Sequence, residues 1–234
     1  ACAPSNVPIN QGVAGASALL QGKHQIDARV EAVRKTHGDY AAAVAEHMAA
    51  LDPSISAWAK GADGEQRLAR FVEKHVGDRV IGLYDRIVPG TRANIDHIWV
   101  AESGVWIVDA KAWKGKVEFR TSGPIWSRTT HLFVAGRNRT DKISALLRQR
   151  EAVLAALRPD PATKGALVHI VMCLLDSTWD TLARPTSVGD VDVMWSRALC
   201  KRLRKGGPLD KAAMEHVARR LDLSLPPAAS PRAS

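Results

Sequence analysis

The sequence contains few cysteines and no long apolar run, and both absences limit what the chain can be. Its three cysteines, Cys2, Cys173 and Cys200, are far apart and lack a CxxC spacing, so they indicate neither a disulfide framework nor a zinc site. Cys173 lies in an apolar run and is predicted to be a small buried residue of a protein in a reducing compartment. No stretch approaches the roughly 18 apolar residues that span a bilayer, and the N-terminal segment lacks the pattern of a signal peptide. We therefore expect a cytoplasmic protein with no membrane segment.

Several well-known catalytic motifs are also absent. The sequence contains no P-loop, no GxGxxG and no GxSxG pattern, so it does not support nucleotide hydrolysis or serine catalysis. Asp176, Asp180, Asp190 and Asp192 form a loose acidic region. Their spacing is not that of a calcium-binding loop, and we expect them to lie at the surface.

Acidic residues are outnumbered by basic ones, and the excess is unevenly placed. The chain holds 33 Lys and Arg against 24 Asp and Glu, a net charge of +9. Residues 1–60 are neutral, whereas residues 61–150 hold sixteen basic and ten acidic residues. A basic domain favours polyanions such as nucleic acid. Solubility alone is the alternative explanation of this charge.

Composition and hydrophobic periodicity divide the chain into four parts. Residues 1–22 are rich in Gly, Ser and Ala and are predicted to form a flexible tail. Residues 23–57 are predicted to be a helical extension with a break at 37–39. Residues 58–223 alternate helix and strand patterns, which indicates an α/β or α+β domain with a mixed sheet flanked by helices. Residues 224–234 are predicted to be disordered.

The elements of the main part follow from the same patterns. Helices are expected over 62–76, 140–157, 197–205 and 209–222, and strands over 79–88, 94–100, 105–111, 116–120, 131–135, 166–175 and 191–195. The run 166–175 is apolar throughout, which is typical of a strand covered on both faces. The turn 101–104 joins two of the strands into a hairpin.

This hairpin places two aspartates opposite each other. If the turn is symmetric, Val100 faces Val105, Asp96 faces Asp109, and Asn94 faces Lys111. Side chains alternate along a strand, so these residues share one face of the sheet. Directly opposed Cβ atoms lie about 4.5–5.5 Å apart. The sequence therefore predicts two converging carboxylates with a lysine beside them.

Such a pair needs a positive charge, because like charges opposite each other destabilise a hairpin. The rest of both strands is apolar, and burying two anions there is costly unless a cation compensates. A divalent metal, Mg²⁺ or Mn²⁺, with oxygen ligands fits this role, and Lys111 is a second compensator. A purely structural triad of Asp96, Asp109 and Lys111 is the alternative.

The chemistry that fits this arrangement is phosphodiester hydrolysis. A metal ion on the two carboxylates would polarise a phosphoryl oxygen and lower the pKa of a bound water, while Lys111 would stabilise developing charge or position the water. Glu65 lies on the apolar face of the predicted helix 62–76, which is expected to face the sheet, and is a third candidate ligand. Capping of that helix or interaction with its dipole is the alternative role for Glu65.

Three blocks of the sequence resemble a known family. The blocks are GADGEQRLAR, VPGTRANIDHIWV and SGVWIVDAKAWKGKV, and together they resemble the nuclease-related domain (NERD) family of the PD-(D/E)xK nuclease superfamily. The resemblance covers roughly residues 58–157. It implies a restriction-endonuclease-like core. The proline that often precedes the first aspartate of the superfamily is replaced here by Ile95.

The resemblance also implies roles for individual residues. Glu65 matches the acid of the first helix, Asp96 the first metal-ligating acid, and Asp109 with Lys111 the (D/E)xK pair. The backbone carbonyl of Ala110 is implied as a further metal contact. Gln149 matches a polar residue placed near the site. These matches imply a Mg²⁺-dependent nuclease.

Further residues are candidates for nucleic-acid contacts. Asn94 is expected on the acid face, whereas His97 points to the other face and is predicted to be a core histidine. A basic and aromatic loop beside the metal site is expected to follow a phosphate backbone, and a basic stripe is expected on the helix 197–205. The loop consists of Trp113, Lys114 and Lys116, and the stripe of Arg197, Lys201 and Arg204. Arg139 and Lys142, which precede or open the predicted helix 140–157, are candidates of the same kind. A solvated turn and a solvated helix face are the alternatives.

Three functions remain open from the sequence. The first is a metal-dependent nuclease that cuts DNA, which is favoured over RNA. The second is a nucleic-acid-binding module of the same fold that cuts poorly or not at all. The third is a regulatory protein whose N-terminal helices bind a partner. A homodimer is compatible with each of them.

Overall fold

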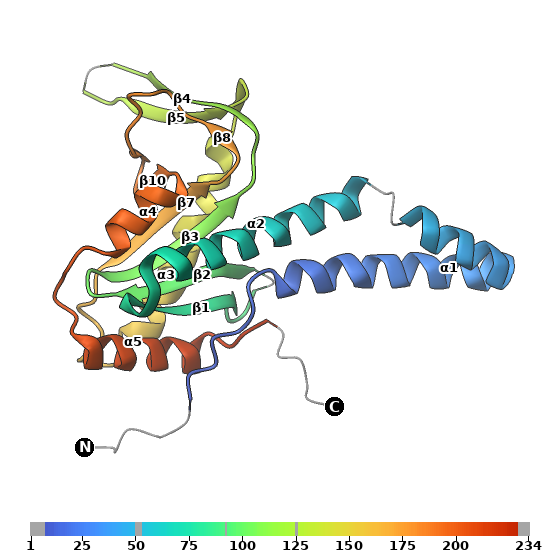
Figure 1. Cartoon of the computed structure of the whole chain (residues 1–234), viewed down its shortest axis with the longest axis horizontal. Helices are drawn as coiled ribbons and strands as arrows, with labels where there is room; N and C mark the ends of the chain where they lie inside the picture. Colours follow the sequence, from blue (N-terminus) through green and yellow to red (C-terminus); the bar gives the residue numbers. More distant parts are fainter. Residues whose placement is uncertain (1–7, 50–52, 92, 125, 229–234) are drawn as a thin grey trace.

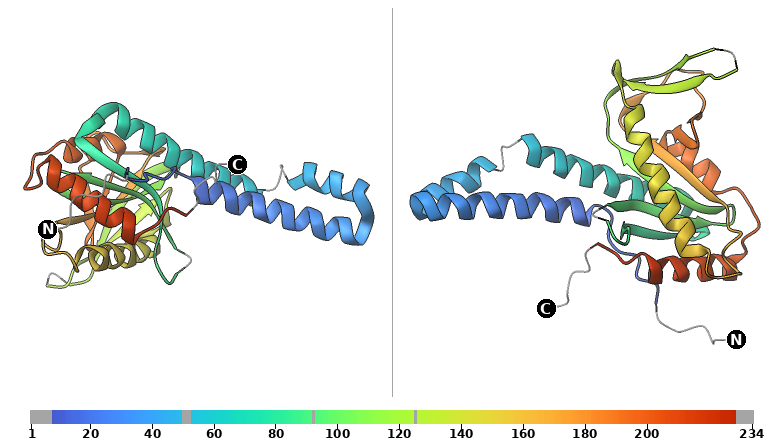
Figure 2. Two further views of the ribbon diagram at one scale, coloured as in Figure 1. Left: turned by 90° about the horizontal axis from the view of Figure 1, so that it is seen from below. Right: turned by 180° about the vertical axis from the view of Figure 1, so that it is seen from behind.

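The computed structural model describes residues 8–49, 53–91, 93–124 and 126–228. These residues form a six-stranded sheet covered by helices on both faces, a smaller four-stranded sheet at one end, and a helical arm that extends from the body (Figures 1 and 2). This architecture confirms the predicted α/β class with a mixed sheet and an N-terminal helical extension. No helix in the described ranges is long and apolar enough to cross a membrane.

The six-stranded sheet contains antiparallel and parallel pairs in the order β1-β2-β3-β7-β10-β9. Its antiparallel part is formed by β1 (Val80–Ile87), β2 (Asn94–Ala101) and β3 (Gly104–Lys111). β7 (Val168–Leu174) pairs in parallel with both β3 and β10 (Val191–Met194), and β9 (Thr186–Val188) closes the far edge. The central position of β7 explains its continuous apolar sequence, because both of its faces are covered.

Helices bury opposite faces of this sheet. One apolar cluster unites α3 (Ile143–Leu157) and α5 (Lys211–Ser224) with one set of strand residues. The other unites α2 (Pro53–Val76) and α4 (Ser196–Leu203) with the alternate set. Along β2, Ile98 and Val100 belong to the first cluster, and Trp99 and Ala101 to the second. The alternation of side chains along a strand therefore decides which helices each residue meets.

The smaller sheet follows directly after β3. It has the order β6-β5-β4-β8 and lies at one end of the larger sheet (Figure 1). Its strands are β4 (Gly115–Ser122), β5 (Thr129–Val134), β6 (Arg137–Asn138) and β8 (Ser177–Thr178). Two short 3-10 helices, Gly77–Arg79 and Thr140–Lys142, precede β1 and α3.

The arm consists of α1 (Ala16–Ala49) and the beginning of α2, and it extends away from the sheets in both views of Figure 2. The predicted break at residues 37–39 is confirmed at Gly38, whose φ of 80° and ψ of 178° interrupt α1. Only glycine adopts this conformation without strain. α2 begins nine residues before the predicted residue 62.

The prediction that residues 1–22 are a flexible tail is wrong where the structure describes them. α1 begins at Ala16, and the segment before it lies along β1, where the carbonyl of Gln11 accepts a hydrogen bond from Tyr84 N at 2.7 Å. The C-terminal prediction needs the same correction, because Pro226 O accepts from Ile87 N and Ala228 N donates to Asp85 O. β1 is an edge strand whose free backbone groups need partners. The composition of the two termini does not reveal this pairing.

Arg86 connects the two terminal segments beneath the sheet. Its side chain is fully buried, and it forms an ion pair with Asp222 at 2.8 Å. It also donates hydrogen bonds to the carbonyls of Asn10 and Leu225. These contacts satisfy the two terminal nitrogens of the guanidinium, which lowers the cost of burying its charge, whereas its buried Nε has no hydrogen-bond partner among the described residues. Cys173 and Cys200 are buried free thiols, as predicted for Cys173, and Cys2 lies outside the described residues.

Candidate active site

The register of the β2–β3 hairpin is the predicted one, but it stops before the aspartates. Val100 pairs with Val105 and Ile98 with Ile107, and the last pair is His97 with Val108. Asp96 and Asp109 therefore lie just beyond the ladder, at the end where the two strands separate. The backbone pairing predicted between Asn94 and Lys111 is absent from the described ladder, because the strands no longer pair there.

The carboxyl groups of Asp96 and Asp109 nevertheless meet. They lie within hydrogen-bonding reach, and the pKa of Asp96 is well above its usual value because of burial, then the charge of Asp109 and then that of Glu65. Asp109 itself is only 9% exposed. Two carboxylates can share a hydrogen bond only if a proton or another cation is present between them. The site is therefore built to hold positive charge.

Lys111 supplies part of that charge. Its ammonium nitrogen lies 2.5 Å from Oδ1 of Asp109. Burial alone lowers the pKa of this lysine, but the charges of Asp109, Asp96 and Glu65 outweigh it, and the pKa is raised above its usual value. Lys111 is consequently a permanent cation at neutral pH, aimed at the same place as the carboxylates.

Glu65 approaches the site from α2. Its pKa is raised to about 7 by burial first, then by the charges of Asp85 and Asp109, partly offset by Lys111. The backbone N–H of Gly15 donates a hydrogen bond to its carboxylate and works in the opposite direction. Because α2 begins at Pro53, Glu65 lies well inside the helix. Helix capping and interaction with the helix dipole apply to residues of the first turn, so neither explains the position of Glu65.

Asp85 is a fourth carboxylate that the sequence analysis missed. It stands in β1 between the pairs Tyr84–His97 and Arg86–Ile95, opposite Asp96, and it is 2% exposed. Its φ of 53° is rare for a residue other than glycine. Strained backbone of this kind is concentrated at functional sites. The one signal in the sequence is an acidic residue, followed by Arg86, in a strand whose other residues are mostly apolar.

The N-terminal segment and β2 satisfy this carboxylate. Ser17 N donates to Oδ2 of Asp85 at 2.5 Å, and the side-chain amide of Asn94 donates to Oδ1 at 3.1 Å. The first turn of α1 thus points its free N–H groups at the acids, where a helix N-terminus stabilises negative charge. The side chain of Asn94 is thus hydrogen-bonded to an acid of the site.

Gln149 reaches the site from the opposite side of the sheet. Its side-chain amide donates to the carbonyl of Asn94 at 2.9 Å, two residues from Asp96. A second clamp holds α2, since Arg67 donates two hydrogen bonds of 2.9 Å to the oxygens of Asp176 in the loop after β7. Both contacts fix the elements that carry the acids.

His97 is a core residue, as predicted. It is fully buried on the α2 face, stacks on Trp99 with ring centroids 4.8 Å apart, and meets the edge of Tyr84. Neither ring nitrogen has a hydrogen-bond partner among the described residues. Burial, with a smaller contribution from Lys111, lowers its pKa to about 3. His97 is therefore neutral and carries no proton to the site.

The predicted basic loop leaves β3 next to the acids. Trp113 is half-buried under the guanidinium of Arg139, 4.8 Å from its ring centroid. Lys114 and Lys116 are exposed, and Lys116 forms an ion pair with Asp180 at 3.4 Å. Lys142 is exposed and paired with Asp141 at 3.0 Å.

The second predicted basic surface lies on α4 and just after it. Arg197, Lys201 and Arg204 are all exposed. α4 packs against α2 on the face opposite α3. Apart from Asn94, the predicted nucleic-acid contacts that follow β3 are the nearest to the acids along the chain.

The donor set at the end of the hairpin fits a small hard cation. In the described part of the chain, no three His, Cys, Asp or Glu side chains already form a cluster arranged to hold a metal. Mg²⁺ does not require one, because it keeps several waters and is commonly held by one or two carboxylates and substrate phosphates. Asp96 and Asp109 supply that pair. The carbonyl of Ala110 and Glu65 are the next oxygen donors, of which Glu65 would act through water or after a small movement.

The mixed sheet, with two acids and a lysine at the open end of its hairpin, is consistent with a nuclease-like α/β domain. Residues 60–174 match the family model described as the nuclease-related domain. No curated protein and no solved structure gives a significant match to the chain. Residues 60–174 are therefore similar to the nuclease-related domain family, which is placed in the PD-(D/E)xK-like nuclease superfamily.

Proposed function

We propose that this protein is a metal-dependent nuclease that hydrolyses phosphodiester bonds of DNA, with Mg²⁺ as its metal and Mn²⁺ as a substitute. The observation that carries the proposal is the contact between Asp96 and Asp109, with Lys111 2.5 Å from Asp109. Such a contact between buried anions is costly to stability. The presence of this contact at the end of the hairpin is best explained by chemistry that uses the charges.

Each residue has a role in this proposal. Asp96 and Asp109 would hold the metal, whose chemistry there would be to polarise the scissile phosphate and lower the pKa of a bound water. Lys111, kept protonated by the acids, donates to a phosphate oxygen and stabilises the charge that develops during cleavage. Glu65, whose pKa is about 7, can take up or release a proton near neutral pH, which suits a general base or acid.

The test is cleavage of plasmid, linear duplex and single-stranded DNA in the presence of Mg²⁺ or a chelator. We expect cleavage that the chelator abolishes. Asp109→Asn and Lys111→Ala should each lower the rate by about 10²–10³-fold, the usual cost of removing one group that stabilises the transition state. Lys164→Ala, which removes an exposed lysine, is the matched control and should retain full activity.

A second function is favoured by one observation. The ion pair between Lys111 and Asp109 is already closed, which is compatible with a binding module that holds nucleic acid without cutting it. If the folded protein binds DNA but cuts none of the three substrates with either metal, the nuclease proposal is wrong and this second function replaces it.

A role of the arm in binding a partner is an additional hypothesis. Tyr40, Val44 and Met48 of α1 are large apolar side chains that remain exposed, Tyr40 by 86%. Exposed apolar groups gathered on one element are typical of interaction surfaces. Truncation of the arm is unsuitable as a test, because α1 also contacts the acids through Ser17.

A further inference from the structure

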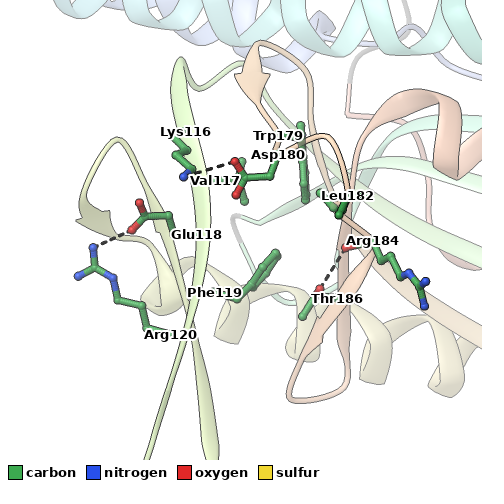
Figure 3. A pocket seen from close by; sticks show the side chains of 11 residues that line it. Lys116, Val117, Glu118, Phe119, Arg120, Trp179, Asp180, Leu182, Arg184 and Thr186 are labelled. Atoms are coloured by element: carbon green, nitrogen blue, oxygen red, sulfur yellow. Dashed lines mark hydrogen bonds and ion pairs between the residues drawn. The ribbon is translucent and has the colours of Figure 1, made fainter.

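A cavity beside the smaller sheet is not used by the site described above. It has a volume of about 550 Å³ and lies between β4 and the segment from Trp179 to Thr186. Figure 3 shows Phe119 of β4 facing Trp179 and Leu182 across this space. The volume is within the range of roughly 300–1,000 Å³ that is typical of ligand sites. The cavity is open to solvent, and Leu182 at its wall is 91% exposed.

Two of the residues that line the cavity, Phe119 and Trp179, are aromatic, in a chain that has few aromatic residues. Phe119 and Trp179 have ring centroids 6.2 Å apart at an angle of 41°, and Trp179 meets Trp195 edge-on at 5.0 Å. The three rings form a row that begins at Trp195, passes through Trp179 and ends with Phe119 at the cavity. Flat apolar faces of this kind bind other flat rings by stacking.

Basic residues outnumber acidic ones in the lining of the cavity. Lys116, Arg120 and Arg184 are its basic residues, and Glu118 and Asp180 are its acidic ones. Glu118 is itself paired with Arg120 at 2.8 Å. At the rim, Lys116 contacts Asp180 in an exposed ion pair of 3.4 Å, which contributes little to stability and opens easily. A ligand that combines a flat ring with negative charge matches this surface.

The cavity is also close to the acids along the chain. β4 begins four residues after Lys111, and Phe119 follows Lys111 by eight residues. Eight residues span at most about 29 Å when fully extended. A nucleic-acid strand covers that distance with fewer than about ten nucleotides at roughly 3.4 Å each. One strand can therefore occupy the cavity and the metal site together.

We propose that this cavity binds an unpaired nucleobase of the nucleic-acid substrate, stacked against Phe119 and Leu182, with Lys116 at the adjacent phosphate. The inference rests on the proposed nuclease function and makes it more specific, because bases inside a duplex cannot enter such a cavity. The preferred substrate is then single-stranded DNA or a duplex with unpaired nucleotides beside the cleavage position. Stacking of a base on aromatic side chains tolerates any sequence.

The test compares two exposed leucines. Leu182→Asp places a carboxylate in the cavity, and Leu223→Asp places the same charge on an equally accessible leucine of α5, which is 80% exposed. Both variants should fold normally because both side chains lie in water. Binding of a fluorescent single-stranded oligonucleotide and of a blunt duplex is measured by anisotropy in the presence of a chelator, so that cleavage does not interfere.

We expect the wild-type protein to bind the single strand more tightly than the duplex. Leu182→Asp should weaken single-strand binding by about 5- to 100-fold, the range for loss of one stacked base, and should affect the duplex no more than Leu223→Asp does. Equal single-strand affinity of the two variants would overturn the proposal. An equal loss for both substrates would overturn it too, because repulsion alone would then explain the result.

The outcome is independent of whether the protein is a nuclease. If single-strand binding depends on Leu182 but no substrate is cut when Mg²⁺ is added, the cavity is a base-binding site and the nuclease function fails. If Leu182→Asp cuts and binds every substrate as Leu223→Asp does, the nuclease function stands and the cavity proposal fails. Phe119→Ala is a second variant, and its melting temperature shows whether the fold tolerates it.

Discussion

The two ends of the β2–β3 hairpin are built from opposite chemistry. Near the turn, Trp99 pairs with Trp106 and Val100 with Val105, and all four side chains are at most 4% exposed. At the open end the pairing stops, and Asp96 and Asp109 meet instead. Burial of the apolar end stabilises the folded protein, whereas the contact between the acids at the other end destabilises it. One short hairpin thus supplies both the well-packed apolar end that stabilises the fold and the destabilising carboxylates, which that packed end holds in position.

The largest expected effect comes from breaking the apolar end. Trp99 is fully buried and stacks on His97, so Trp99→Ala leaves a large cavity and should lower the free energy of unfolding by about 3–5 kcal/mol. Urea denaturation measures this loss. Trp126→Ala, which removes a tryptophan that is 88% exposed, is the control and should change stability by no more than about 0.5 kcal/mol.

The acidic end should show itself in the pH dependence of stability. The pKa of Glu65 is raised from 4.5 to about 7 in the folded protein, so the folded state keeps a proton that the unfolded chain has lost. Its stabilising contribution is complete below about pH 4.5 and is lost as the pH rises through 7, by about 1.4 kcal/mol per pH unit for one proton. Asp96, whose pKa is also raised, acts in the same direction.

This pH dependence is measured by urea denaturation of the metal-free protein between about pH 5 and 8. Glu65→Gln should flatten the curve, because glutamine does not titrate. Mg²⁺ should also flatten it, since the metal replaces the proton as the compensating charge. If the free energy of unfolding of the wild-type protein is constant or rises over this pH range, the acids at the open end of the hairpin do not have raised pKa values.

A smaller effect is expected from two glycine substitutions, which distinguish the loss of the contact between Gly15 and Glu65 from backbone strain alone. Gly15 and Gly38 both have positive φ, 75° and 80°, but a Cβ on Gly15 would lie 2.9 Å from Ala62 O, whereas one on Gly38 would meet nothing within 4 Å. Alanine at either position costs about 1–2 kcal/mol of backbone strain. Gly15→Ala should in addition displace the N–H that lowers the pKa of Glu65.

The readout is the pH profile of stability for both variants. Gly38→Ala should shift the whole curve downward without moving it along the pH axis. Gly15→Ala should move the decline to higher pH, because Glu65 loses a hydrogen bond that favours its charged form. Identical profiles would mean that the backbone of Gly15 does not position Glu65.

Much of the hairpin could be predicted from the sequence, and the reason is local. The turn 101–104 fixes the register, and strict alternation places Asp96 with Asp109 on one side and His97 on the other. The end of the ladder after His97 could not be predicted, nor could the positive φ of Asp85, which lies opposite Asp96 in β1. The predicted opposition of Asn94 to Lys111 was wrong because the ladder ends at His97.

The terminal segments could not be predicted for a different reason. Residues 8–17 have no hydrophobic period, yet Gln11 pairs with β1 and Ser17 N contacts Asp85. These contacts join residues about 70 positions apart in the chain, and composition carries no information about them. Asp85 itself gave only a weak signal, an acid in an apolar strand. The cavity at Phe119 depends likewise on Trp179, a distant residue brought beside β4 by β8.

The most direct test of the central claim is calorimetric titration of Mg²⁺ into the metal-free protein at about pH 8. We predict saturable binding by the wild-type protein and at least a tenfold loss of affinity in Asp96→Asn and in Asp109→Asn, with no loss in Asp190→Asn, an exposed aspartate distant from both along the chain. Equal affinity of all four proteins, or no heat of binding in any of them, would contradict the account that these two aspartates are held together to bind a metal ion.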